Sequence, residues 1–154
     1  MGLVRTNLSD EEIKDERNEG ESVIEIYPEF KEALEGLSGY SHIFVLSYLH
    51  KLRPDQVGPL KVRPRRLLRK GLKLEELPEV GVFALDSPTR PNPIGLSLVK
   101  VARIVWTRIF VNGLDLFNGT SVLDIKPYRG DYKADSFELP EWYRTIHRKL
   151  GEDV

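Results

Sequence analysis

Two short segments of the sequence combine residue types that could bind a ligand and move a proton. In the first, residues 90–95 (RPNPIG), two prolines with fixed φ leave the backbone few conformations to lose when a ligand binds. The second, residues 123–128 (LDIKPY), carries a carboxylate, an ammonium and a phenol at Asp124, Lys126 and Tyr128. Alternate side chains of a strand project on one face, so these three groups could form one polar constellation.

Each segment also has a simpler interpretation. The RPNPIG segment could be a rigid connection between two strands. Asp124 and Lys126 could form an ion pair that stabilises the sheet, whereas a carboxylate beside a lysine could also act as a general base. The residues alone leave both interpretations open.

The histidines do not favour a metal centre. His42 and His50 are eight residues apart, which is roughly 26 Å along a straight strand at about 3.3 Å per residue. They cannot chelate one ion together, and the sequence has no cysteine, so no metal is expected. His147 falls in the tail of the chain, where we expect it at the surface.

Charge is unevenly distributed, although the net charge is only −1. Residues 10–21 contain seven acidic and two basic side chains, whereas residues 51–73 contain nine basic side chains and a single acidic one, Asp55. Such runs are often solvated loops. A basic cluster of this density would also attract the phosphates of a nucleic acid.

The elements that must position these groups are mostly strands. The patterns predict strands over 22–27, 40–50, 80–85, 96–106 with a continuation over 108–111, and 120–125. The run at 40–50 is nearly continuously apolar, which predicts burial on both faces. Helices are expected after Pro28, where Phe30, Ala33, Leu34 and Leu37 form an apolar stripe, and over 65–70 and 140–150.

This pattern predicts a mainly β fold, an antiparallel β-barrel with a few peripheral helices. No Gly-rich turn joins a strand to a helix, which argues against a Rossmann-type cofactor site. A chain of 154 residues predicts one domain, 1–154. No apolar window suggests a membrane span or a signal peptide, so we expect a cytoplasmic protein, and its Lys/Glu-rich composition suggests a thermophilic source.

The sequence resembles the TrmO family, also called TsaA-like or YaeB-like proteins. The resemblance is carried by GESVIEIYPEFKEALEGLSGYSHIFVL, EVGVFALDSPTRPNPIGLSLVKV and GLDLFNGTSVLDIKPY, in family order, across most of residues 20–128. It implies an antiparallel β-barrel methyltransferase that uses S-adenosyl-L-methionine (SAM) and works as a homodimer with SAM near the subunit interface. It also implies tRNA as the partner, with methylation at N6 of N6-threonylcarbamoyladenosine beside the anticodon.

The resemblance and the chemistry of the side chains together assign expected roles. Asp124 is the expected base, with Lys126, Tyr128 and His42 beside it in the catalytic cleft. The residues expected to bind SAM are Arg5, Phe83, Ala84, Ser87, Arg90, Pro91, Asn92, Pro93, Ile94 and Gly95. The residues expected to bind RNA phosphates are Arg63, Arg65 and Arg66.

The chain also departs from the family pattern. Many members carry Ala-Thr-Arg-Ser-Pro where this chain has residues 84–88 (ALDSP), so an arginine is replaced by Asp86. The proline that usually follows Thr6 is missing, and the acidic segment 10–21 is an unfavourable neighbour for RNA. Two alternatives therefore stay open: a barrel methyltransferase for another RNA or a small metabolite, and a non-catalytic RNA-binding barrel.

Overall fold

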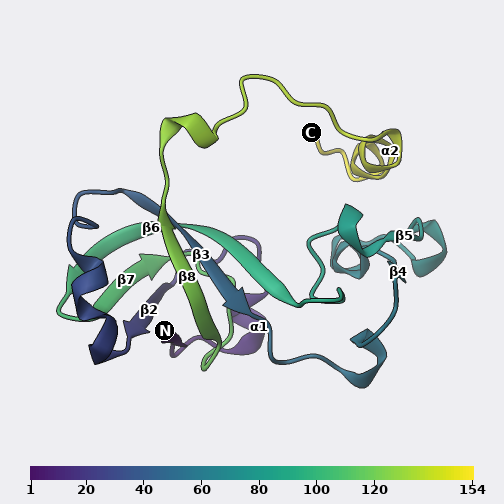
Figure 1. The fold of residues 1–154 in the computed structure, drawn as a ribbon. Coiled ribbons are helices and arrows are strands. Elements are labelled where there is room, and N and C mark those ends of the chain that lie inside the picture. The colour runs from purple at the N-terminus through teal and green to yellow at the C-terminus, as the bar shows by residue number, and fades with distance from the viewer. The chain divides into compact units, whose positions relative to one another are not determined.

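A closed antiparallel β-barrel is the main feature of the computed structural model, which describes residues 1–154 (Figure 1). Its strands follow one another around the barrel in the order β1-β2-β7-β6-β3-β8. Their bounds are Gly2–Arg5 (β1), Glu21–Ile26 (β2), His42–Tyr48 (β3), Ile94–Val105 (β6), Arg108–Asn112 (β7) and Ser121–Pro127 (β8). The predicted mainly β, antiparallel barrel fold is confirmed.

The chain divides into two compact units, of which the barrel is the first. The first unit contains Met1–Lys51 and Asn92–Tyr132, and the second contains Leu52–Pro91 and Lys133–Val154. The second unit holds a two-stranded sheet of β4 (Lys61–Val62) and β5 (Val80–Gly81). It also holds the C-terminal helix α2 (Glu141–Lys149) and the short 3-10 helices η2 (Pro54–Gln56), η3 (Arg65–Lys70), η4 (Leu74–Glu76) and η5 (Val82–Ala84).

Aliphatic side chains that alternate along the strands fill the barrel. Successive residues of a strand point to opposite sides, so every second one enters the interior. The buried cluster consists of Val4, Ile24, Ile26, Ile43, Val45, Val99, Ile109, Val111, Leu114, Leu116 and Val122. These β-branched and leucine side chains close the barrel around one apolar core.

The strand predicted over 40–50 is shorter than expected and is buried on one face only. In β3, Ile43, Val45 and Ser47 are fully buried, whereas Phe44 is half-buried and Tyr48 is exposed. A barrel strand has a single interior side, so the apolar residues on its other face cover the outer surface. The prediction of burial on both faces was wrong for this reason.

Three other elements differ from their predictions. The segment after Pro28 is a short 3-10 helix, η1 (Pro28–Leu34), with Phe30 exposed and Leu34 packed against the core. The strand predicted over 80–85 is only β5, followed by η5. Residues 108–111 do not continue the preceding strand, because the chain reverses at Trp106-Thr107 and β7 pairs antiparallel with β6. No Gly, Asn or Pro marks that turn.

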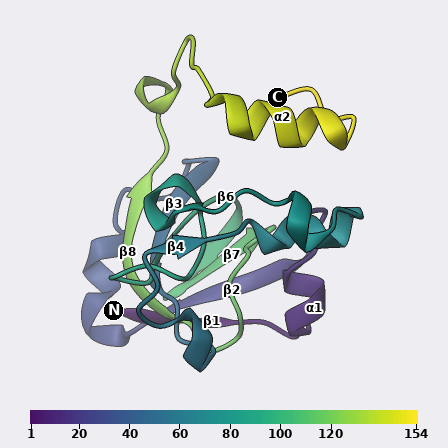
Figure 2. The ribbon, with the colours of Figure 1, turned by 90° about the vertical axis from the view of Figure 1, so that its right-hand side faces the viewer.

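The strand β1 and a short helix, α1, were not predicted, although the sequence carries a clear signal for the start of the helix. The helix α1 (Asp10–Ile13) stands where the chain passes from β1 to β2 (Figure 2). Its capping box joins Ser9 and Glu12, a Ser-x-x-Glu pattern that marks a helix start. The hydrogen bonds from the Ser9 backbone and hydroxyl lower the pKa of Glu12. Lys51 forms an ion pair with Asp10 at 2.8 Å.

A separate core holds the second unit together. Leu67, Leu77 and Ile146 form its buried cluster. Beside them His147 is 8% exposed, and its Nδ1 lies 2.5 Å from Glu152 Oε2, so the expectation of a surface histidine was wrong. The ammonium of Lys70, at 2.6 Å, and then His147 hold the pKa of Glu152 below its usual value. The contacts of Glu152 with Lys70 and His147 therefore link the end of α2 to the end of η3.

Close packing against the neighbouring strand explains why the RPNPIG segment ends in glycine, Gly95. A Cβ at Gly95 would lie 2.6 Å from Ser47 Oγ and 3.0 Å from Leu49 Cδ2. Gly95 pairs with Ser47 in the barrel sheet, so the neighbouring strand leaves no room for a larger residue. Ser47 Oγ is itself buried and has no hydrogen-bond partner.

Gly95→Ala should therefore destabilise the barrel by about 1–3 kcal/mol through overpacking. Ser47→Ala removes the hydroxyl oxygen that the new methyl group would meet and breaks no hydrogen bond, so it should be nearly neutral alone and should rescue part of the loss in the double variant. Urea unfolding of the two single variants and the double variant measures this coupling. A purely additive double variant would contradict the proposed contact.

Candidate active site

The outer face of the barrel around β3 brings the two motifs together. β3 lies between β6 and β8, and antiparallel partners that face each other point to the same side. One cross-strand row contains Asp124, Leu46 and Leu96. The next row along the strands contains Lys126, Phe44 and Leu98, again in the order β8, β3, β6. These two rows define the outer face, which is the candidate active site.

The end of the RPNPIG segment enters this face through β6. The N–H of Leu49 donates to Pro93 O at 2.8 Å, and the N–H of Ile94 donates to Asn92 O at 2.7 Å. Ile94 pairs with Tyr48 at the edge of the outer face. One strand therefore separates the start of β6 from Asp124, which places the backbones of Leu96 and Asp124 about 10 Å apart across the sheet.

The polar centre of the outer face is an ion pair. Lys126 Nζ lies 3.2 Å from Asp124 Oδ2, and their side chains are 55% and 47% exposed. Asp124 Oδ1 also accepts the N–H of Ile125 at 2.9 Å, which fixes the carboxylate relative to the strand. A half-exposed carboxylate held in this way remains open to a substrate.

Aromatic rings border the ion pair on one side. The Tyr128 ring lies 5.7 Å from Phe44, 6.3 Å from His42 and 6.2 Å from Tyr132, measured between centroids. His42 Nδ1 lies 2.9 Å from Ser41 Oγ. The structure thus brings the predicted residues Asp124, Lys126, Tyr128 and His42 onto neighbouring positions. Tyr132 was not predicted as a site residue, because it follows β8 in η6 (Gly130–Tyr132) and no motif distinguishes it.

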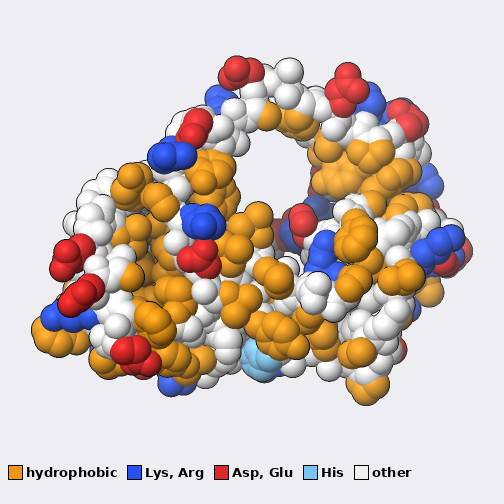
Figure 3. Space-filling view, in the orientation of Figure 1, with side chains coloured by type: hydrophobic (Ala, Val, Ile, Leu, Met, Phe, Trp, Pro, Cys, Tyr) orange, Lys and Arg blue, Asp and Glu red, His pale blue; other side chains and the backbone are white.

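Exposed apolar side chains cover much of the remaining outer face. Figure 3 shows hydrophobic side chains gathered over the region where β3, β6 and β8 lie in Figure 1. The exposed members are Tyr48, Ile94, Leu96, Leu98 and Leu123. A contiguous exposed apolar patch is unusual on a monomer and marks a binding surface.

The other residues expected to bind SAM lie elsewhere along the chain. Arg5 is the last residue of β1 and pairs with Val23 of β2. The second unit contains Phe83, Ala84, Ser87, Arg90 and Pro91. Within it, the Arg90 guanidinium donates to Leu85 O at 3.0 Å and Ser87 O at 2.8 Å, so this side chain braces its own loop.

The basic residues expected to meet RNA differ in their surroundings. The Arg63 guanidinium donates to Leu77 O and lies 3.8 Å from Glu79, which gives it a structural role within the second unit. Arg65 and Arg66 are exposed at the start of η3. Because the side chains of Arg65 and Arg66 are more exposed than that of Arg63, they are better placed to contact phosphate groups.

The donor set of the outer face suits SAM and does not suggest a metal ion. SAM combines a flat adenine, a sulfonium cation and an amino-acid group with both charges. The face offers apolar and aromatic surface from Leu98 and Phe44, and the opposite charges of Asp124 and Lys126. No group of three or more His, Cys, Asp or Glu side chains is placed to hold a metal.

None of the helices has both the length and the apolar character that a membrane span requires.

The ion pair should matter little for folding. Because both side chains are about half exposed, Asp124→Asn should change the free energy of unfolding by less than about 1 kcal/mol. Val45→Ala on the adjacent buried position of β3 is the control, and it should cost about 2 kcal/mol or more. Thermal unfolding distinguishes the two, and a large loss for Asp124→Asn would instead support the structural interpretation of the pair.

Comparison with known proteins identifies the family of this chain. Residues 13–134 match the family model described as the tRNA-methyltransferase O N-terminal domain. A probable SAM-binding protein of Methanothermobacter thermautotrophicus is 37% identical over 140 residues, covering 89% of this chain and 93% of that protein. A tRNA (adenine(37)-N6)-methyltransferase of Rattus norvegicus is 39% identical over 118 residues, which are 77% of this chain and 25% of that protein.

A solved structure shows the same fold. The crystal structure of TrmO from Pseudomonas aeruginosa matches with a TM-score of 0.64 and 32% identity, covering 88% of this chain and 58% of that one. The chain thus spans less than two thirds of that protein. The extent of the family match and the identities to these relatives confirm the predicted resemblance, and the chain belongs to the TrmO family.

Proposed function

We propose that this chain is a SAM-dependent methyltransferase that methylates the N6 position of N6-threonylcarbamoyladenosine beside the tRNA anticodon. The observation that carries the proposal is the outer face of the barrel, where the Asp124–Lys126 pair lies one strand away from residues 92–95. Membership of the TrmO family supports both the cofactor and the reaction type. The names of the relatives, SAM-binding protein and tRNA (adenine(37)-N6)-methyltransferase, support the same activity.

In this proposal the outer face holds SAM. Residues 92–95 form a stiff edge beside the apolar surface of β6, which suits the adenosyl group. The carboxylate of Asp124 and the aromatic rings near it favour a cation. SAM supplies an activated methyl group when it is bound.

The protein's own chemical task is to position the substrate and to accept a proton. The exocyclic nitrogen of the substrate must lose its N–H proton as the new N–C bond forms and the bond between the methyl group and the donor's sulfur breaks, leaving a neutral thioether. Asp124 accepts that proton, either directly or through one water molecule. Lys126, whose Nζ lies 3.2 Å from Asp124 Oδ2, positions the carboxylate, and Tyr128 and His42 orient the substrate beside it. Arg65 and Arg66 bind RNA phosphates.

Asp86 favours one alternative substrate class. It is exposed in the second unit, where many family members carry an arginine. If the arginine of those members meets a phosphate, this chain lacks that contact, and another RNA or a small metabolite would replace the modified tRNA. The assay below separates these substrates.

Methyl transfer from labelled SAM tests the proposal. The label should pass to tRNA that contains threonylcarbamoyladenosine and not to tRNA that lacks it, and SAM should raise the melting temperature through linkage. Asp124→Asn should lower kcat by about 10²- to 10⁴-fold if it removes the base, with little loss of SAM-induced stabilisation. Val57→Ala, at an exposed position of the second unit, is the control. Equal transfer to both tRNAs, or none, would refute the assigned substrate.

The outer face is also the dimer surface in this proposal. Its exposed leucines, Leu96 and Leu98, are 67% and 50% exposed and lie beside the polar centre. A twofold contact between two copies would bury the same patch on both subunits. It would also exclude water from the neighbourhood of Asp124.

A charge on this patch should therefore break the dimer. Leu96→Lys should shift the sedimentation coefficient from that of a dimer to that of a monomer, because an ammonium would be buried against an apolar surface. Leu60→Lys is a matched control, since Leu60 is 68% exposed in the second unit. Dimers that persist in Leu96→Lys, or that are lost equally in Leu60→Lys, would refute the assigned interface.

A further inference from the structure

The hairpin between β6 and β7 carries an exposed tryptophan in an unfavourable backbone conformation. Trp106 has φ +58°, and no other residue except glycines has a positive φ. It is the first residue of a two-residue hairpin connection, where glycine is preferred because a Cβ is strained at positive φ. Its side chain is 72% exposed, so burial of the ring does not offset that strain. Strained residues of this kind gather at functional sites.

Backbone contacts fix the turn that carries Trp106, and one cation lies against its ring. Thr107, the second residue of the turn, is buried, and its carbonyl accepts the N–H of Ile26 at 2.9 Å. Val105 pairs with Arg108 and closes the hairpin. The Lys31 ammonium lies 3.6 Å from the centroid of the Trp106 ring and steadies it from one side. The ring is therefore presented to solvent in a defined place.

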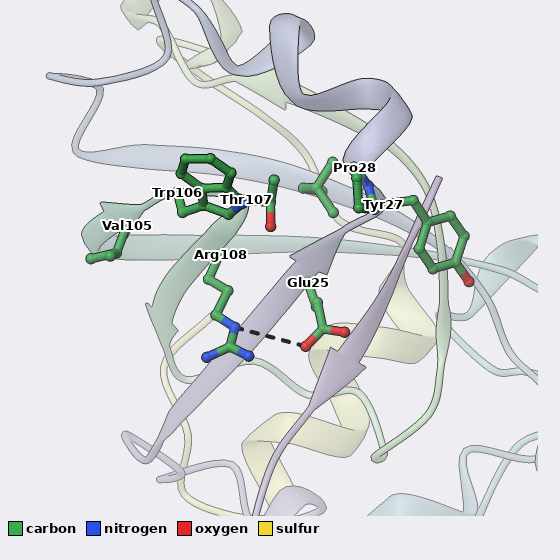
Figure 4. Close-up of a pocket in the computed structure, with 8 residues that line it drawn as sticks. Glu25, Tyr27, Pro28, Val105, Trp106, Thr107 and Arg108 are labelled. Atoms are coloured by element: carbon green, nitrogen blue, oxygen red, sulfur yellow. Dashed lines mark ion pairs between the residues drawn. The ribbon is translucent and has the colours of Figure 1, made fainter.

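A shallow pocket lies beside the ring. Its volume is about 390 Å³, and Figure 4 shows the Trp106 side chain at one end of its lining, Glu25 and Arg108 below, and the Tyr27 ring at the opposite end, pointing away from the others. Arg108 Nε lies 3.9 Å from Glu25 Oε2, so the charges of the lining offset each other. A pocket of this kind favours a flat, uncharged ring with polar edges over a bare phosphate or an ammonium.

The pocket is remote from the outer face described above. Residues 92–95 lie at the start of β6, whose first residue is Ile94, whereas Trp106 follows its last residue, Val105. A strand of this length spans roughly 36 Å at about 3.3 Å per residue when it is straight. A ligand in this pocket would not compete with SAM, although a long polymer could reach both places.

We propose that Trp106 is a stacking site for an unpaired nucleobase, with the polar groups of Glu25 and Arg108 available to the edges of the base. The inference rests on the proposed action on RNA, and it adds a contact distant from the site of methyl transfer. Exposed aromatic rings are the usual platforms for unpaired bases, because every base presents a π face. The base arrives either in an RNA strand or as a free nucleotide.

Fluorescence of Trp106 tests this site directly. In the Trp142→Phe variant Trp106 is the remaining tryptophan, so a base that stacks on it should quench the emission. The probes are a 12-nucleotide single-stranded oligouridine, the same strand paired with oligoadenine, and uridine monophosphate. Quenching by the single strand and not by the duplex supports an RNA base, and quenching by the monophosphate alone supports a free nucleotide. Quenching by none of them, or by the duplex as strongly as by the single strand, overturns the proposal.

Two substitutions separate stacking from folding. Trp106→Gly suits the positive φ, so it should keep or raise the melting temperature and weaken single-strand binding at least about fivefold. Trp106→Phe should retain most of the affinity. Unchanged affinity in Trp106→Gly would overturn the proposal. SAM-induced stabilisation and label transfer are measured in parallel, so a failure of the proposed methyltransferase function is distinguished from a failure of this site.

Discussion

The register of β3 against its two neighbours is the constraint on which the site depends. β3 pairs with β6 along its whole length and with β8 through a single irregularity between Leu46 and Ser47. A shift of one residue would turn Asp124 and Lys126 into the core and bring Ile125 out. The buried aliphatic residues of β3, Ile43 and Val45, prevent such a shift, because leaving the interior would expose them.

Packing at the start of β6 supports the same arrangement. Gly95 faces Ser47 so closely that only glycine fits, and the backbone of Leu49 holds Pro93. The RPNPIG segment, residues 90–95, therefore serves two purposes at once. Its glycine allows the strands to approach, and its prolines stiffen the chain that enters the outer face.

Two carboxylates of this chain, Glu152 and Asp124, differ in their cationic partners and in their surroundings. Glu152 is held by Lys70 and His147 close to the apolar core of the second unit, and its pKa is lowered. Asp124 has one cationic partner, Lys126, and both side chains remain half exposed. The first arrangement stabilises a fold, whereas the second leaves a carboxylate that a substrate can reach.

The sequence by itself determined the barrel class, the placement of Asp124, Lys126 and Tyr128 on one face of a strand, and the C-terminal helix. These follow from local periodicity, because a strand or helix repeats its pattern over a few residues. The family also followed from the sequence, through motifs whose order and spacing are specific.

Only the tertiary structure decided which residues meet across strands. Strand pairing placed Leu46 between Leu96 and Asp124, and the ring of Tyr132, in η6 after β8, packs against Phe44. The turn at Trp106-Thr107 had no local signal, and His147 lies buried beside an apolar cluster that contains the distant Leu67 and Leu77. Such contacts depend on closure of the barrel and on long-range packing, and neither leaves a short-range pattern in the chain.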